Sequence, residues 1–65
     1  MRDLTKREFC RRCLKYGFKP MGFLGYFDLG LGRLGGVSVY NAGGSYRAQL
    51  AYLIRSRAEK EREKH

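Results

Sequence analysis

The chain has 65 residues and a formal net charge of +8, from 14 Lys and Arg against 6 Asp and Glu. A chain this short forms at most one small domain and has little surface to spare for an enclosed cleft, so we expect a binding protein rather than an enzyme, and no cofactor. It has no apolar run long enough to span a bilayer and no apolar stretch after its basic N-terminus of the kind that a signal peptide needs, which predicts a cytoplasmic protein without an integral membrane segment.

A helix is predicted from about Lys6 to Tyr16. Thr5 and Glu8 have the spacing of a capping box, in which each side chain accepts a hydrogen bond from the backbone amide of the other residue. Gly17 can adopt the left-handed conformation that commonly ends a helix. Both ends of this helix are therefore marked in the sequence.

The two sides of this helix differ in character. Its expected apolar side consists of Phe9, Cys10, Cys13 and Leu14. Its expected outer side carries Arg7, Arg11 and Lys15, with Arg12 nearby. Glu8 is the only acidic residue between Lys6 and Lys15, so this outer side is a candidate for contacts with phosphates. The alternative is an ordinary solvated helix face.

A hairpin is predicted in the middle of the chain. Residues 21–29 alternate in polarity and predict a strand, and residues 37–40 predict a second, β-branched strand that pairs back on the first. Residues 30–37 fit the GxGxxGxV string of a kinase phosphate loop, but the chain has no room for the other kinase motifs. We therefore favour a glycine-rich hairpin turn, in which Arg33 is a candidate contact for a backbone phosphate.

The chain is expected to close with a second helix capped by Ser45. The apolar side of this helix is predicted to comprise Tyr46, Leu50, Leu53 and Ile54. The side chains expected to look outward or to flank that side are Arg47, Gln49, Tyr52, Arg55 and Ser56. Residues 59–65 have no apolar side chain, so we expect a single domain over 1–58 and a charged, frayed helical extension over 59–65.

The pair Cys10 and Cys13 invites a zinc or redox interpretation. Zinc requires four ligands, and the only other candidate in the chain is His65, so two chains would have to contribute cysteines. A reactive dithiol gains from a helix N-terminus, whereas these two lie near the middle of the predicted helix. We therefore expect both to be core residues and predict no metal site. We also expect no Ser-His-Asp or Cys-His site, because the single histidine is His65, at the end of the chain.

The order helix, strand, strand, helix predicts an α+β fold, in which two helices cover a two-stranded antiparallel hairpin. The charge distribution predicts binding to nucleic acid, or association with a nucleoprotein, through phosphate contacts from both helix faces. Tyr26, Tyr40 and Tyr52 are aromatic side chains that could stack on bases. The predicted contact residues are Arg7, Arg11, Arg12, Lys15, Arg33, Arg47, Tyr52 and Arg55.

Two other hypotheses remain open. A thin sheet leaves unpaired edges and one uncovered face, so the chain could be a protein-interaction module or a homodimeric regulator that uses this face and the glycine-rich loop. Peripheral attachment to anionic membranes is the third hypothesis, and it requires the Phe- and Leu-bearing loop to insert.

Overall fold

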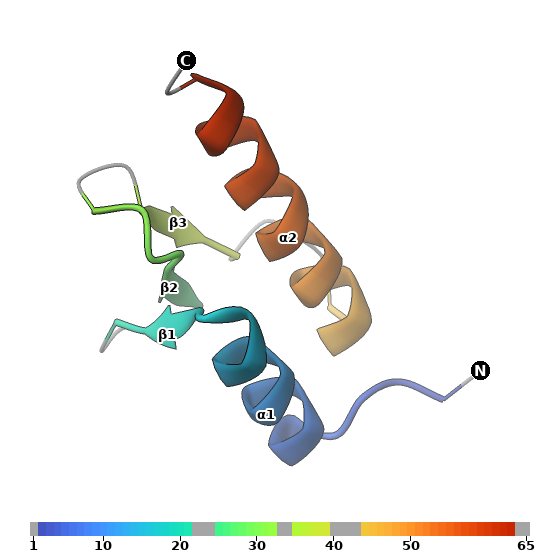
Figure 1. Ribbon diagram of the computed structural model, residues 1–65. Coiled ribbons are helices and arrows are strands. Elements are labelled where there is room, and N and C mark those ends of the chain that lie inside the picture. The colour runs from blue at the N-terminus through green and yellow to red at the C-terminus, as the bar shows by residue number, and fades with distance from the viewer. Residues whose placement is uncertain (1, 22–24, 33–34, 40–43, 64–65) are drawn as a thin grey trace.

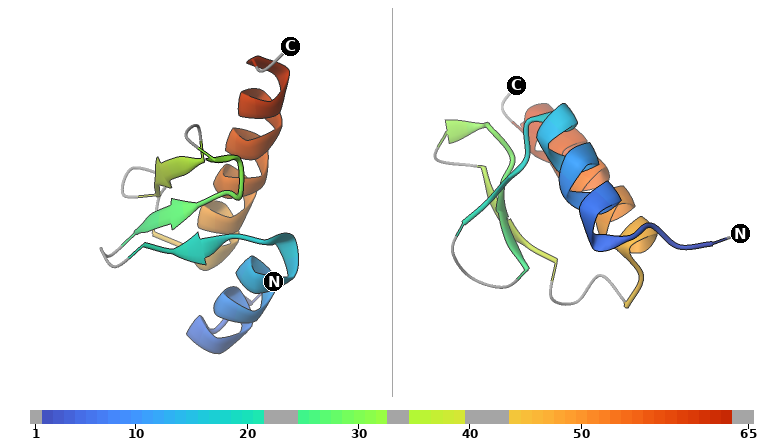
Figure 2. Two further views of the ribbon diagram at one scale, coloured as in Figure 1. Left: turned by 60° about the vertical axis from the view of Figure 1, so that its left-hand side comes forward. Right: turned by 90° about the horizontal axis from the view of Figure 1, so that it is seen from below.

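The computed structural model describes residues 2–21, 25–32, 35–39 and 44–63. In chain order the elements are α1 (Lys6–Tyr16), β1 (Lys19–Pro20), β2 (Tyr26–Asp28), β3 (Gly36–Ser38) and α2 (Tyr46–Glu63) (Figure 1). The strands form one antiparallel sheet in the order β1-β2-β3, and both helices lie on the same side of it (Figure 2). This is the predicted α+β fold class. No helix in the described part of the chain is long and apolar enough to cross a membrane.

The bounds of α1 are those predicted, because both of its capping signals operate. The Thr5 amide donates to Glu8 Oε1 at 3.0 Å and the Glu8 amide donates to Thr5 Oγ1 at 3.1 Å, which completes the capping box. At the other end Gly17 has a φ of 85°, and the amide of Phe18 donates to the Cys13 carbonyl at 2.8 Å. These bonds satisfy backbone groups that the helix leaves unpaired.

The buried side of α1 is narrower than predicted. Phe9 and Cys13 are buried, whereas Cys10 is exposed and Leu14 is 64% exposed, so the prediction that Cys10 and Leu14 lie in the core was wrong. Each residue advances about 100° around a helix, which places positions 10 and 14 beside the stripe formed by positions 9 and 13. The sheet and α2 cover that one stripe, and the neighbouring stripe faces water.

The first predicted strand differs most from the structure. Met21 does not begin β2; it follows β1, and its amide donates to the Tyr26 carbonyl at 2.9 Å. The chain therefore reverses direction before β2, and Gly25, with a φ of 81°, lies at the end of this reversal. Residues 22–24 lie outside the described part. The reversal adds β1 as a third strand, on an edge where the missing N–H of Pro20 is tolerated.

The predicted hairpin between β2 and β3 is present. Tyr26 pairs with Ser38, and Asp28 pairs with Gly36. In the turn, Gly30 and Gly32 have φ values of 78° and 66°, which glycine adopts without strain. The glycine-rich segment is therefore a hairpin turn, as predicted; Arg33 in this turn and Tyr40 after β3 lie outside the described residues.

The second helix begins as predicted, with the Ala48 amide donating to Ser45 Oγ at 3.1 Å. Its buried side differs from the prediction in two residues, because Ile54 is 39% exposed and Ser56 is 8% exposed. A stripe that starts at Leu50 and Leu53 continues one turn later at Ser56, and Ile54 lies about 100° away from Leu53. The helix continues to Glu63 and so includes residues 59–63.

Aromatic contacts join α1 both to the sheet and to α2. The ring of Phe9 packs edge-on against Phe27 of β2, with centroids 5.8 Å apart, and stacks on Tyr46 of α2 at 4.9 Å. Alternation along β2 is as predicted, because Phe27 and Leu29 are buried. The buried hydrophobic cluster consists of Leu4, Phe9, Cys13, Phe18, Phe27, Leu29, Val39, Leu50 and Leu53.

Candidate nucleic-acid interface

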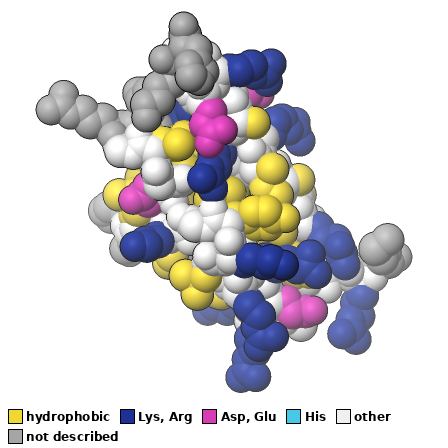
Figure 3. Space-filling model, in the orientation of Figure 1, with side chains coloured by type: hydrophobic (Ala, Val, Ile, Leu, Met, Phe, Trp, Pro, Cys, Tyr) yellow, Lys and Arg dark blue, Asp and Glu magenta, His cyan; other side chains and the backbone are white. Residues whose placement is uncertain are grey.

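A basic stripe runs along α1 on the side opposite the core. Arg7, Arg11 and Lys15 are exposed and recur every fourth residue, so each turn of the helix presents one cation. Figure 3 shows Lys and Arg side chains gathered over α1 and the start of α2, with little acidic surface among them. We call Arg7, Arg11 and Lys15 the α1 stripe.

The acidic residues of 1–58 bind backbone amides. Asp3 accepts hydrogen bonds from the amides of Tyr46 and Arg47, each at 3.0 Å, and so caps the start of α2 from the opposite end of the chain. Glu8 accepts from the Thr5 amide in the capping box, and Asp28 accepts from the Gly30 amide at 2.8 Å in the hairpin turn. Each of these carboxylates therefore has a structural role.

These hydrogen bonds also affect titration. The amides of Tyr46 and then Arg47 lower the pKa of Asp3, with a smaller contribution from the positive charge of Arg47. The Thr5 amide and hydroxyl lower the pKa of Glu8, and the charges of Arg2 and Arg12 lower it further. Both carboxylates therefore stay ionised at neutral pH.

The positive charge of the domain is left uncompensated by this arrangement. Residues 1–58 contain eleven Lys and Arg and three Asp and Glu, which leaves a net charge of +8 in this segment, and residues 59–65 contain three of each. Within the described ranges, the only ion pair joins Arg57 Nε to Glu61 Oε1 at 3.2 Å. The α1 stripe forms no ion pair with any described residue.

A second group of basic residues lies near the capping carboxylates Asp3 and Glu8. Arg12 is close enough to Glu8 to lower its pKa, and Arg47 is close enough to Asp3 to do the same. The Arg47 Nε also donates to the Arg2 carbonyl at 2.9 Å, which fixes its side chain against the N-terminal arm. The structure therefore places Arg12 near Glu8 and Arg47 near Asp3, and it adds Arg2, which sequence reasoning missed.

The remaining predicted contact residues do not join this surface by any observed contact. Arg55 is exposed on the outer side of α2, away from the stripe that contains Leu53. Tyr52 is half-buried and packs against the hydrophobic cluster. Arg33 lies outside the described residues.

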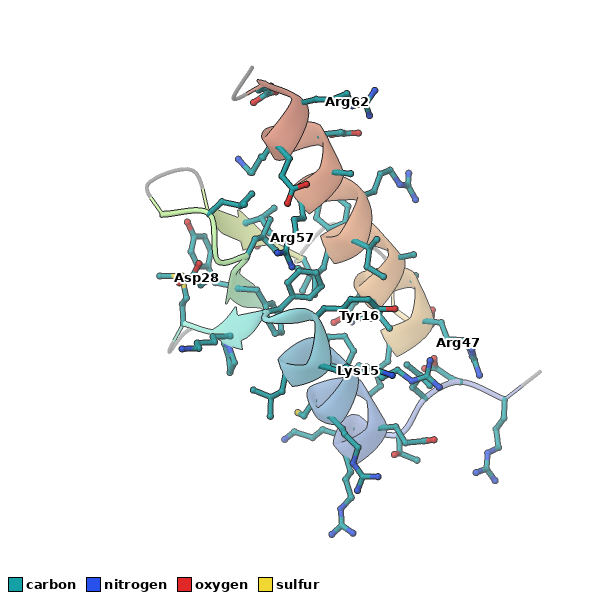
Figure 4. All side chains as sticks on the ribbon, viewed as in Figure 1. Lys15, Tyr16, Asp28, Arg47, Arg57 and Arg62 are labelled. Atoms are coloured by element: carbon teal, nitrogen blue, oxygen red, sulfur yellow. The ribbon has the colours of Figure 1, made fainter. Side chains whose placement is uncertain are left out.

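Arg57 is a functional candidate that the sequence did not reveal. Its Nη1 donates to the carbonyl of Tyr16, the last residue of α1, at 2.5 Å, and its guanidinium lies 5.9 Å from the centre of the Phe18 ring. Figure 4 shows its side chain at the junction of α1, α2 and the sheet. These partners lie about forty positions away along the chain, so no local pattern could have identified them.

Tyr16 is the second residue that sequence reasoning missed. Its ring is stacked on that of Phe18, with centroids 5.7 Å apart and an interplanar angle of 20°. Tyr16 is nevertheless 45% exposed, whereas Phe18 is buried. A tyrosine in the last helical turn before a Gly-Phe pair is the only local signal for this arrangement.

The two cysteines lie in different environments. Cys13 is buried, as predicted, and burial raises the pKa of its thiol to about 11, with a smaller contribution from Cys10. Cys10 is exposed and both are free thiols. Among residues 2–21, 25–32, 35–39 and 44–63 there is no group of three or more His, Cys, Asp or Glu placed to hold a metal ion.

Comparisons of this chain with protein-family models, with curated proteins and with solved structures find no match.

Proposed function

We propose that this chain is a cytoplasmic, non-catalytic protein that binds nucleic acid, or belongs to a nucleoprotein, through contacts with phosphates. One observation carries the proposal: the three carboxylates of residues 1–58 accept hydrogen bonds from backbone amides, while the cations of the α1 stripe have no acidic partner among the residues that the structure describes. A field of this kind attracts polyanions and repels other cations.

The α1 stripe is the principal contact surface in this proposal. Its cations recur once per turn along a straight element, so they can meet successive phosphates and release counterions from them. Arg12 and Arg47 extend the surface to the start of α2, while Arg55 and Arg33 are contacts of the same kind on separate parts of the molecule. Tyr52 has a smaller part, because its ring is half-buried against the core.

Salt-dependent titration tests the proposal. We would measure the affinity of the chain for duplex and single-stranded DNA and RNA at several salt concentrations, and compare the triple variant Arg7→Gln, Arg11→Gln, Lys15→Gln. Each lost phosphate contact lowers the slope of log affinity against log salt by about 0.7 to 0.9. We therefore expect the triple variant to reduce the slope by roughly 2 to 3.

A matched control removes the same charge elsewhere. The triple variant Lys19→Gln, Lys60→Gln, Arg62→Gln also loses three positive charges, but none of these residues belongs to the α1 stripe. We expect it to change the slope by less than about 1. Salt-insensitive binding, no binding, or equal effects of the two triple variants would contradict the proposal.

A second candidate function is a protein-interaction module, either with another protein or as a homodimer. It is favoured by the exposed apolar side chains Leu14 and Met21, at 64% and 46%, and by the position of β1 and β3 as the edge strands of the described sheet. The outer face of the sheet is less open than expected, because the Tyr26 ring lies across Gly36, where an added Cβ would come within 2.5 Å of the tyrosine hydroxyl. Sedimentation that finds a strict monomer, together with no captured protein partner, would count against this function.

A further inference from the structure

The exposed side chain of Tyr16 has the features of a stacking platform. One face of its ring is supported by Phe18, which is itself only 1% exposed, so the tyrosine ring rests on a fixed part of the core. The 45% exposure of Tyr16 leaves part of the ring accessible to a second planar group. Nucleic-acid bases stack on accessible aromatic side chains of this kind.

The platform is held in place by α2. Arg57 binds the backbone carbonyl of Tyr16, and the same guanidinium lies 5.9 Å from the centre of the Phe18 ring. Ile54, which is 39% exposed, lies one helical turn before Arg57 and therefore on the same side of α2. The hydrogen bond from Arg57 therefore holds the Tyr16 backbone at the end of α1, while stacking on Phe18 orients the Tyr16 ring, so the ring is preorganised for a ligand.

Two cations lie on the same side of the molecule as this platform. Lys15 is the adjacent residue in the chain and the last member of the α1 stripe, and Figure 4 shows Lys15 and Tyr16 extending from the end of α1 towards α2, with Arg47 on the same side of the molecule. Figure 3 shows an apolar area over the junction of the helices, with Lys and Arg side chains directly below it. A phosphate on these cations would bring its own base within reach of an aromatic ring.

We propose that Tyr16 stacks on an unpaired base, and that the ligand of this surface is single-stranded nucleic acid. The inference rests on the proposed function, because the phosphates must first bind the α1 stripe. A base inside a duplex has both faces covered by its neighbours, so it offers nothing to a side chain at the surface of a folded domain. A single strand offers base faces and phosphates together.

Oligonucleotides that differ only in their bases test the inference on the unmodified protein. We would compare a single-stranded oligonucleotide with one of the same length in which every site is abasic, and with the corresponding duplex. Stacking of one base changes affinity by roughly five- to hundredfold. We expect the base-bearing strand to bind at least about tenfold more tightly than the abasic strand, which carries the same phosphates.

Variants then assign the base dependence to one residue. Tyr16→Phe keeps the ring and should keep the preference for bases, whereas Tyr16→Ala should remove it and leave abasic binding unchanged. Leu14→Ala is the matched control, because Leu14 is an exposed apolar residue on the same helix but has no part in the platform; it should retain the preference. Circular dichroism would confirm that each variant is folded.

The outcomes separate this inference from the function on which it rests. Equal affinity for base-bearing and abasic strands, or tighter binding of the duplex, would overturn base stacking and leave phosphate binding standing. A base preference that survives Tyr16→Ala would also overturn it. No binding to any of the three ligands would overturn both proposals.

Discussion

Two residues far apart in the chain cap the helices from outside. Asp3, in the N-terminal arm, binds the first amides of α2, and Arg57, in α2, binds the last carbonyl of α1. Each charge is the one that the helix end favours, because a helix N-terminus attracts anions and its C-terminus attracts cations. These two side chains tie the helices together independently of the hydrophobic core.

Replacing Arg57 should destabilise the fold. Arg57→Ala removes the hydrogen bond to the Tyr16 carbonyl and the contact with the Phe18 ring, and hydrogen bonds from charged groups and exposed cation–π contacts together contribute about 1 to 2 kcal/mol. Urea unfolding followed by circular dichroism measures the change. The control Glu61→Gln removes only the exposed ion pair and should cost less than about 0.5 kcal/mol. Equal losses in the two variants would contradict the capping role of Arg57.

The hairpin turn requires glycine at position 35, because there is no space for a Cβ atom. A Cβ there would lie 2.8 Å from Asp28 Oδ1, 3.0 Å from the Leu31 amide nitrogen and 3.1 Å from the Gly32 carbonyl oxygen. Two of these three atoms belong to the backbone and cannot move without opening the turn. Overpacking of this kind costs about 1 to 3 kcal/mol, which is the loss expected for Gly35→Ala.

Gly44→Ala is the matched control for Gly35→Ala. A Cβ at Gly44 would meet no atom within 4 Å, and its φ does not lie in the left-handed region. We expect a change of less than about 0.5 kcal/mol in the free energy of unfolding. If thermal unfolding shows the two glycine variants to be equally stable, the packing of the turn is not as described.

At the scale of elements, the carboxylates that cap the N-termini of the two helices make the stability of the fold depend on pH. Hydrogen bonds in the folded state lower the pKa of Asp3 from 3.8 and that of Glu8 from 4.5. A carboxyl with a lower pKa in the folded than in the unfolded state contributes stability above its unfolded pKa and loses it as the pH falls through the folded value. The chain should therefore lose stability progressively as the pH drops below about 4.5.

Asp3→Asn tests the contribution of the α2 cap. The amide side chain has a single oxygen acceptor in place of two, so it cannot bind both α2 amides and does not titrate. We expect the variant to be less stable at neutral pH and to lose less stability than the unmodified chain between about pH 5 and pH 2. Urea unfolding at several pH values measures this, with Glu63→Gln as a control that removes a carboxylate without touching a cap. A pH dependence identical to that of the unmodified chain would contradict the assignment.

The elements differ in how far the sequence predicted them. The bounds of α1 were predicted from the capping box and Gly17, because these signals act within a few residues of each other. The start of β2 was predicted wrongly, because an alternating run looks the same whether it forms one strand or folds back on itself. Only the pairing of Lys19 with Asp28 distinguishes the two possibilities.

The sequence also predicted only part of the candidate site. The α1 stripe follows from the period of the helix once its start is known, and it lies on the exposed side as predicted. Tyr16 and Arg57 were missed, because their importance depends on contacts between the end of α1 and the middle of α2.

At the scale of the whole molecule, the positive charge belongs to residues 1–58. Residues 59–65 carry three positive and three negative side chains, so a chain that ends at Ala58 keeps the formal charge of +8. We expect this truncation to keep its affinity for single-stranded nucleic acid within roughly twofold, at a small cost in stability from the lost Arg57–Glu61 pair. Direct titration at one salt concentration measures this. A large loss of affinity would show that the C-terminal extension contributes to binding.

The sequence by itself determined the α+β class, both helices with their caps, the glycine-rich turn and the size of the charge surplus, because each depends on composition or on residues within one or two turns of one another. The tertiary structure alone decided which described cations remain without an acidic partner, because that depends on which backbone amides Asp3, Glu8 and Asp28 bind. It also decided that Tyr16, supported by Phe18 and held by Arg57, is the exposed ring at the junction of the helices. Contacts across some forty residues depend on how the helices pack, and packing is a property of the folded chain.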